Sequence, residues 1–164
     1  MTALTANELM RWNDATAKGL LAVLRKHPEA LALPCDVREG SSVADLLQHI
    51  VAAELRYAER LHGEMVTEYE DIAKDSAESL YATHDRALET LRALLSDANY
   101  PWEEELEFPT RSIAGKLVAT RRAIFSHALL HSIRHYAQLA TLLRQHGISV
   151  GFPMDFLFVT ARAA

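Results

Sequence analysis

Hydrophobic residues recur every three or four positions in four stretches of the sequence, and short segments that hold most of its prolines separate them. The first two stretches cover residues 5–26 and 43–62, and the other two cover residues 76–95 and 112–146. This period matches the turn of an α-helix, about 3.6 residues, so each stretch predicts a helix with one apolar face. A serine at Ser41–Ser42 can cap the second predicted helix through its hydroxyl, and Gly147 suits the left-handed position after the fourth.

The segments between and after these stretches predict little further regular structure. Residues 100–111 contain two prolines beside an alternating run, which favours a loop or a short extended segment. Residues 148–164 are aromatic and apolar enough to pack back on the helices. Four amphipathic helices of this length bury their apolar faces best against one another. The sequence therefore predicts an all-α four-helix bundle, formed by a single domain of residues 1–164.

Composition and charge exclude several classes of protein. The apolar residues AVILMFWYC make up 49 % of the chain, which excludes a disordered protein. No apolar run approaches the ~20 residues that span a bilayer, and the first residues lack the features of a signal peptide. The single cysteine, Cys35, cannot form an internal disulfide, so we expect a cytoplasmic protein without a membrane partner. The net charge of −5 argues against a nucleic-acid partner.

Three histidines lie within nine residues of the fourth predicted helix. His127, His131 and His135 are four residues apart, so each ring lies ~40° around the helix and ~6 Å along it from the previous one. Neighbouring members of such a series can bind one metal ion, whereas His127 and His135 are ~12 Å apart along the axis. On a helical wheel, His131 and His135 fall within the apolar stripe and His127 lies on its flank. The pair that points inward is therefore His131 and His135.

Two imidazoles on an apolar face allow two interpretations. Each buried ring needs hydrogen-bond partners, so the pair either bonds within the core or binds a shared metal. A metal site needs a third ligand, for which the pattern offers His84, Glu54 and His49. His84 and Glu54 lie on the apolar stripes of their helices, whereas His49 lies at the edge of its stripe and is not favoured by pattern. For Glu54, a buried ion pair with an arginine is the simplest role, and catalysis as a general base is the alternative.

Two motifs resemble those of the DinB-like (YfiT-like) family of metalloenzymes, which are built on a four-helix bundle. The first motif is SVADLLQHIVAAE, residues 42–54, and the second is HSIRHYAQL, residues 131–139, followed by LLRQHG. The resemblance covers nearly the whole chain. It implies that one histidine of the second helix and two of the last long helix hold a divalent metal, here His49, His131 and His135. Many relatives have arginine where this chain has Tyr136, a departure that concerns substrate contacts more than metal binding.

The resemblance also implies a function. Three imidazoles suit a divalent Zn, Ni, Fe or Cu ion and leave a coordination position open, as catalytic sites do. Relatives with assigned activities are thiol-dependent transferases or isomerases, and others are hydrolytic. We therefore expect a metal-dependent transferase or hydrolase that acts on a small molecule, with a low-molecular-weight thiol as a candidate partner. Dimers are common among the relatives, which implies a homodimer.

The competing interpretation is a protein without catalytic activity. It would be a dimeric ligand-binding or stress-response module whose metal is structural or incidental. In that case we expect an aromatic side chain from the end of the chain, such as Phe152, Phe156 or Phe158, to close the mouth of the site beside His49. An open cavity beside the three histidines would favour the enzyme.

Overall fold

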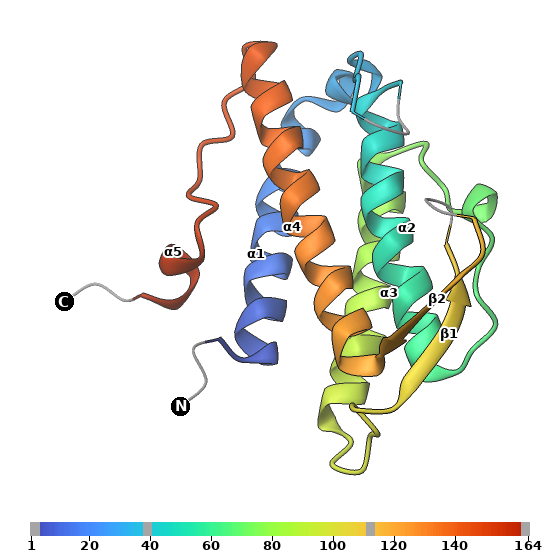
Figure 1. Cartoon of the computed structure of the whole chain (residues 1–164). Helices are drawn as coiled ribbons and strands as arrows, with labels where there is room; N and C mark the ends of the chain where they lie inside the picture. The colour runs from blue at the N-terminus through green and yellow to red at the C-terminus, as the bar shows by residue number, and fades with distance from the viewer. Residues whose placement is uncertain (1–3, 38–40, 111–113, 162–164) are drawn as a thin grey trace.

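The structure is a computed structural model that describes residues 4–37, 41–110 and 114–161. This part of the chain is mostly helical and includes one small antiparallel sheet (Figure 1). The long helices are α1 (Ala6–Lys26), α2 (Val43–His62), α3 (Ala77–Ser96) and α4 (Arg121–Gln145). The sheet consists of β1 (Glu105–Pro109) and β2 (Lys116–Thr120). The short helices are η1 (Pro28–Ala32), η2 (Tyr69–Asp71) and α5 (Phe156–Thr160).

The four long helices lie side by side (Figure 1). Both α1 and α2 pack against α3 and α4, and their apolar faces meet in one core. Removing these faces from water is the main force that holds the helices together. The contact between α2 and α4 matters most for function, because it brings residues far apart in the sequence onto facing surfaces. No helix in the described residues combines the length and the apolar character needed to cross a membrane.

Short sequence signals fix the ends of the helices. The side chains of Thr5, Ser42 and Ser76 cap α1, α2 and α3, and each accepts a hydrogen bond from the backbone N–H three residues later. Gly63 ends α2 with φ of 82°, and Gly147 follows α4 with φ of 78°, a left-handed conformation that costs glycine little. The predicted serine cap is therefore confirmed, with Ser42 as the capping residue, and so is the left-handed conformation of Gly147.

The start of α4 differs from the prediction. Residues 116–120 form strand β2, in which Thr120 lies opposite Glu105 and Lys116 lies opposite Pro109. The helix begins only at Arg121, where the Thr120 hydroxyl accepts the backbone N–H of Ala123 at 3.2 Å. The predicted all-helical region from Ser112 is therefore wrong over β2, although Ser112 itself lies outside the described residues. A short apolar run fits a strand as well as a helix, and here pairing with β1 decides between them.

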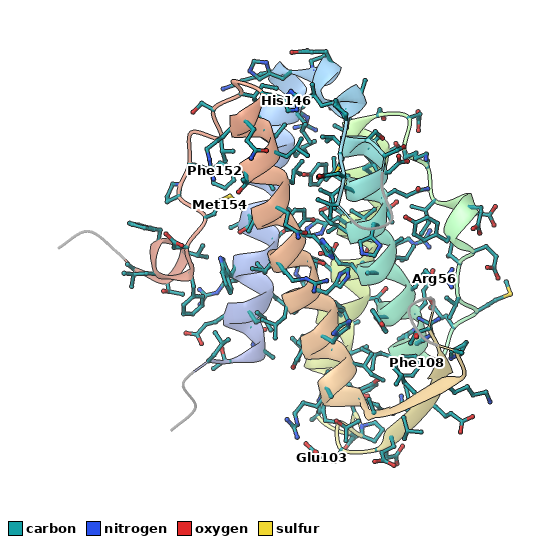
Figure 2. The ribbon with its side chains drawn as sticks, turned by 45° about the horizontal axis from the view of Figure 1, so that its top comes forward. Arg56, Glu103, Phe108, His146, Phe152 and Met154 are labelled. Carbon is teal, nitrogen blue, oxygen red and sulfur yellow. The ribbon has the colours of Figure 1, made fainter. Side chains whose placement is uncertain are left out.

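The C-terminal segment, residues 148–161, contacts α1. The indole Nε1 of Trp12 donates to the carbonyl oxygen of Met154 at 2.7 Å, and the ring centroid of Trp12 lies 5.6 Å from that of Phe156. The Phe152 ring covers Gly19 so closely that a Cβ at position 19 would come within 2.3 Å of it. Figure 2 shows Phe152 and Met154 on this side of the molecule, away from Arg56.

Candidate metal centre

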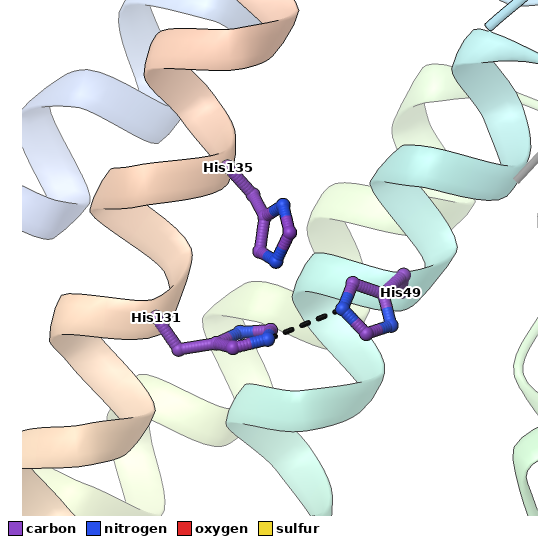
Figure 3. Close-up of side chains that lie close together, drawn as sticks. All are labelled: His49, His131 and His135. Carbon is purple, nitrogen blue, oxygen red and sulfur yellow. Dashed lines mark hydrogen bonds between the residues drawn. The ribbon is translucent and has the colours of Figure 1, made fainter. Parts of the chain in front are cut away.

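Three histidines from two helices converge between α2 and α4 (Figure 3). His131 and His135 lie one turn apart on α4, and both rings point toward His49 on the facing surface of α2. The ring centroids of His49 and His131 are 4.9 Å apart, and those of His49 and His135 are 4.8 Å apart. The structure thus brings together the three histidines to which the sequence analysis pointed.

The ring nitrogens are close enough to share one ion. One nitrogen from each of the three rings lies within 4.8 Å of the others, and the Nε2 atoms of His49 and His131 are 3.1 Å apart. Two nitrogens bound to one tetrahedral zinc ion at ~2.0–2.1 Å would be ~3.3 Å apart. The separation of the His49 and His131 nitrogens therefore fits coordination of the same metal ion. These three histidines could hold a metal ion.

The environment of His131 keeps its ring neutral. Burial, together with the neighbouring rings of His135 and His49, lowers the pKa of His131 to about 3. Its Nδ1 is buried and has no hydrogen-bond partner in the described part of the chain. A neutral imidazole has a lone pair to donate to a cation, which an imidazolium lacks.

Neighbouring side chains orient His135, which is only 5 % exposed. Its Nδ1 lies 2.6 Å from the Gln138 carbonyl oxygen, an acceptor, so the ring proton is on Nδ1 and the lone pair is on Nε2. That Nε2 accepts a hydrogen bond from the Arg134 guanidinium at 2.9 Å. A cation bound to this nitrogen would take the place of Arg134. The contact from Gln138 is the kind that fixes the orientation and tautomer of a metal-binding histidine.

The three histidines line an open cavity of about 820 Å³. Its wall consists of residues from α2 and α4 together with residues that follow η1, the Tyr69 ring and the end of β1. None of Phe152, Phe156 and Phe158 belongs to this lining in the described residues. The lining residues are Asp36, Val37, His49, Ala52, Ala53, Arg56, Tyr57, Arg60, Tyr69, Pro109, Thr110, His127, His131, Arg134, His135 and Gln138.

The other two candidates for a third ligand, His84 and Glu54, pair with each other in the core. His84 Nδ1 lies 2.6 Å from a Glu54 carboxylate oxygen, and both side chains are fully buried. Asn13 donates to the other Glu54 oxygen at 3.0 Å. The expected ion pair of Glu54 with an arginine is therefore wrong, because the cationic partner is a histidine. Neither residue belongs to the cavity lining.

Asp14, His84 and Asp85 form a second group of potential ligands, in which Asp14 and His84 are already held in ion pairs. Asp14 lies 2.9 Å from Lys18 and 3.3 Å from Arg92. Both ring nitrogens of His84 face carboxylates, those of Glu54 and Asp14. Burial by itself would lower the pKa of His84, but these two carboxylates outweigh it and raise the pKa to about 9. The negative charges of Asp14 and Glu54 are thus balanced by cationic side chains of the protein.

Sequence reasoning missed the other functional groups of the cavity. Arg56 and Arg60 follow His49 on α2, and Tyr57 lies beside them with its ring 5.3 Å from that of His127. His127 also lies 5.5 Å from the His131 ring, so it belongs to the cavity wall rather than to the group of three. The spacing could have predicted that Arg56 and Arg60 lie on the same side of α2 as His49, since positions 49, 53, 56 and 60 share one face of a helix.

One comparison with known proteins bears on this arrangement. The sequence model of the DinB family matches residues 1–161. No curated protein matches the chain at a significant level. The match spans all the elements described above, including both helices that carry the histidines. The chain belongs to the DinB family.

Proposed function

We propose that this DinB-family chain is a metal-dependent enzyme, either a transferase that uses a low-molecular-weight thiol or a hydrolase. A divalent transition ion, Zn, Ni or Fe, would be bound by His49, His131 and His135. The observation that carries the proposal is the meeting of these three rings, with nitrogens within 4.8 Å of one another, at the wall of an open cavity.

The chain's own residues support a catalytic rather than a closed site. Three protein ligands leave at least one coordination position for water or substrate, and the cavity gives a small molecule access to it. A divalent ion held in this way supplies Lewis-acid chemistry, because it lowers the pKa of a bound water or thiol. Gln138 holds the His135 ring in place, and burial keeps His131 neutral. The donor set therefore fits the proposed group.

The non-catalytic alternative receives less support from the cavity. That alternative expected an aromatic side chain to close the site beside His49. Phe152 instead packs on Gly19, and Phe156 packs on Trp12, both at α1. Phe158 is 60 % exposed. The lining in the described residues includes none of them, so access to the histidines supports the enzyme.

Elemental analysis of purified, untagged protein tests the proposal. We expect the native chain to carry a stoichiometric transition metal, and His131→Ala and His135→Ala to lose it, because two imidazoles on separate helices bind far more weakly than three. His146→Ala is the matched control: His146 is an exposed residue directly after α4, away from the cavity, and the variant should keep the metal (Figure 2). Unchanged metal content in His135→Ala would contradict the proposal.

The rest of the expected organisation is part of the same proposal. The four long helices and the hairpin would form one DinB-type four-helix-bundle domain, with the C-terminal segment packed on it. The protein would act as a homodimer in the cytoplasm. Sedimentation equilibrium measures the oligomeric state, and a screen of low-molecular-weight thiols with the metal-loaded protein measures the activity.

A further inference from the structure

We propose that Arg56 and Arg60 form an anion-binding subsite in the cavity of the three histidines, so that the substrate is an elongated small molecule with an anionic group. The carboxylate or phosphate of the substrate would lie at these arginines while its reacting group lies at the histidines. This inference rests on the proposed function, since it names the substrate class of that site.

The register of α2 points both arginines along the same face as the histidine. Arg56 and Arg60 come seven and eleven residues after His49, which is two and three turns of helix, or ~10 and ~16 Å along the axis. The positions between them on this face are Ala52 and Ala53, which also line the cavity. These small side chains leave room for a ligand between the two ends.

Arg60 forms no close ion pair in the described part of the chain, although the charge of Glu59 acts on it from a distance. Its guanidinium lies over the rings of Tyr57 and Phe108, at 5.6 and 5.5 Å from their centroids. Its hydrogen-bond contact is a long one, 3.5 Å, to the Arg56 carbonyl oxygen. Burial lowers the pKa of Arg60, and the neighbouring charge of Arg56 lowers it further. The negative charge of a bound anion would offset both effects.

Arg56 is only partly satisfied by the protein. It donates to the Thr67 carbonyl oxygen, and its nearest carboxylate, that of the exposed Glu68, is 3.9 Å away. By contrast, Arg25 and Arg86, which lie outside the cavity, form ion pairs at 2.9 and 2.8 Å with glutamates. Neither Arg56 nor Arg60 has an ion pair of this length, so both can still pair with the anionic group of a ligand.

The net charge of the cavity supports the same inference. Three arginines line it, Arg56, Arg60 and Arg134, and the carboxylate among the described lining residues is Asp36. The chain as a whole has a net charge of −5, so the charge of this cavity lining is opposite in sign to that of the whole protein. A cleft lined by one sign of charge concentrates ligands of the opposite sign. Arginine also matches carboxylates and phosphates through its fork of N–H groups.

An aromatic surface connects the arginine subsite with the three histidines. The Tyr57 ring packs edge-on against His127 at 5.3 Å and against Phe108 at 5.9 Å. His127 in turn lies beside His131. The middle of a bound ligand would therefore lie along Tyr57 and the alanines, which favours an apolar connecting portion.

Binding of a matched pair of probes tests the subsite. Both probes are measured on protein loaded with Co²⁺ as a spectroscopic substitute for the native metal. Mercaptooctanoate and mercaptooctanol share a thiol that can bind the cobalt ion, and they differ only in the group at the other end, which is anionic in the first. We expect the carboxylate to bind at least ~10-fold more tightly than the alcohol, because a charge-assisted pair with arginine stabilises the complex. The thiolate–cobalt absorption band reports binding, and competition by phosphate or acetate tells which anion the subsite prefers.

Variants locate the effect. Arg60→Met keeps the apolar stem over Tyr57 and should abolish most of the carboxylate preference, and Arg56→Gln should reduce it, both without loss of metal. Arg144→Gln, at the exposed end of α4, is the matched control and should keep the preference. Equal affinities for the two probes in the native protein, or an unchanged preference in Arg60→Met, would overturn the subsite.

A second measurement separates this inference from the proposed function. Octanoate and octanol are compared on the metal-free protein by calorimetry, where no metal contact contributes. If the chain binds no metal but prefers octanoate, the metal proposal fails and the subsite stands. If the metal binds and octanoate has no advantage, the subsite fails and the metal proposal stands.

Discussion

At the scale of single residues, Gln138 offers a test of the metal centre that leaves all three ligands in place. Its carbonyl oxygen accepts the Nδ1–H of His135 at 2.6 Å. Gln138→Leu removes this acceptor, so the ring can rotate or carry its proton on Nε2, where the metal would bind. We expect metal affinity to fall about 10- to 100-fold, measured by competition with a chelator.

The matched control for Gln138→Leu is Gln145→Leu. Both glutamines are exposed residues of α4, but Gln145 lies at its C-terminal end, outside the cavity lining. Its substitution should leave metal affinity unchanged. An affinity in Gln138→Leu equal to that of the control would mean that His135 needs no support from this contact.

Some features of the site follow from the sequence of one helix, whereas others depend on how two helices pack together. The inward direction of His131 and His135 was predictable, since it follows from the register of one helix. The position of His49 at the margin of its stripe was also predictable, but not its meeting with the pair, which depends on how α2 packs on α4. The pairing of Glu54 with His84 could not be predicted for the same reason, because the two residues lie on different helices.

At the scale of helices, the N-terminus of α2 depends on its capping box. The Ser42 hydroxyl accepts the Asp45 N–H at 3.2 Å, and the Asp45 carboxylate accepts the Ser42 N–H at 3.1 Å. Ser42→Ala leaves the first of these donors unsatisfied. We expect the free energy of unfolding to fall by about 1 kcal/mol, measured by urea denaturation.

Ser126→Ala is the control for the capping prediction. The Ser126 hydroxyl donates to the Arg122 carbonyl oxygen within α4, an exposed contact that helix geometry does not require. Its loss should change stability by less than ~0.5 kcal/mol, as usual for surface substitutions. If Ser42→Ala were no more destabilising than Ser126→Ala, the cap would not contribute to the stability of the protein.

The elements also differ in how far sequence determines them. The first three long helices, each with a capping serine or threonine and a long apolar stripe, form close to their predicted bounds. Strand β2 was predicted as helix, because Leu117 and Val118 continue the apolar pattern without a break. Its conformation depends on β1, and β1 lies in a segment that the sequence marked only as extended or loop. Pairing between segments is information that a local period does not carry.

At the scale of the whole molecule, a buried polar network joins three of the long helices. Asn13 of α1 and His84 of α3 both contact the Glu54 carboxylate of α2, and His84 also lies 3.4 Å from Asp14 of α1. Removing one member of a buried pair leaves a charge without compensation, which is strongly destabilising. The network therefore makes the stability of the whole helix assembly depend on the protonation of His84.

The pKa of His84 gives that dependence a direction. The Glu54 and Asp14 carboxylates outweigh burial and raise the pKa to about 9, against ~6.5 for histidine in an unfolded chain. The folded state therefore holds the proton more tightly. Its contribution is complete below pH ~6.5 and is lost as the pH rises through about 9. We expect the free energy of unfolding of the metal-free protein to fall across this window, measured by urea denaturation at several pH values.

Two variants assign this fall to His84. His84→Gln has no titrating group at this position, so its stability should be lower overall and nearly constant between pH ~6.5 and ~9. His62→Gln replaces an exposed histidine that pairs with the exposed Glu64, and it should keep the decline of the native protein. The metal-free form is required because metal binding has its own pH dependence. A native protein equally stable, or more stable, at the upper end of the window would mean that His84 is neutral in the fold and that Glu54 carries the buried charge alone.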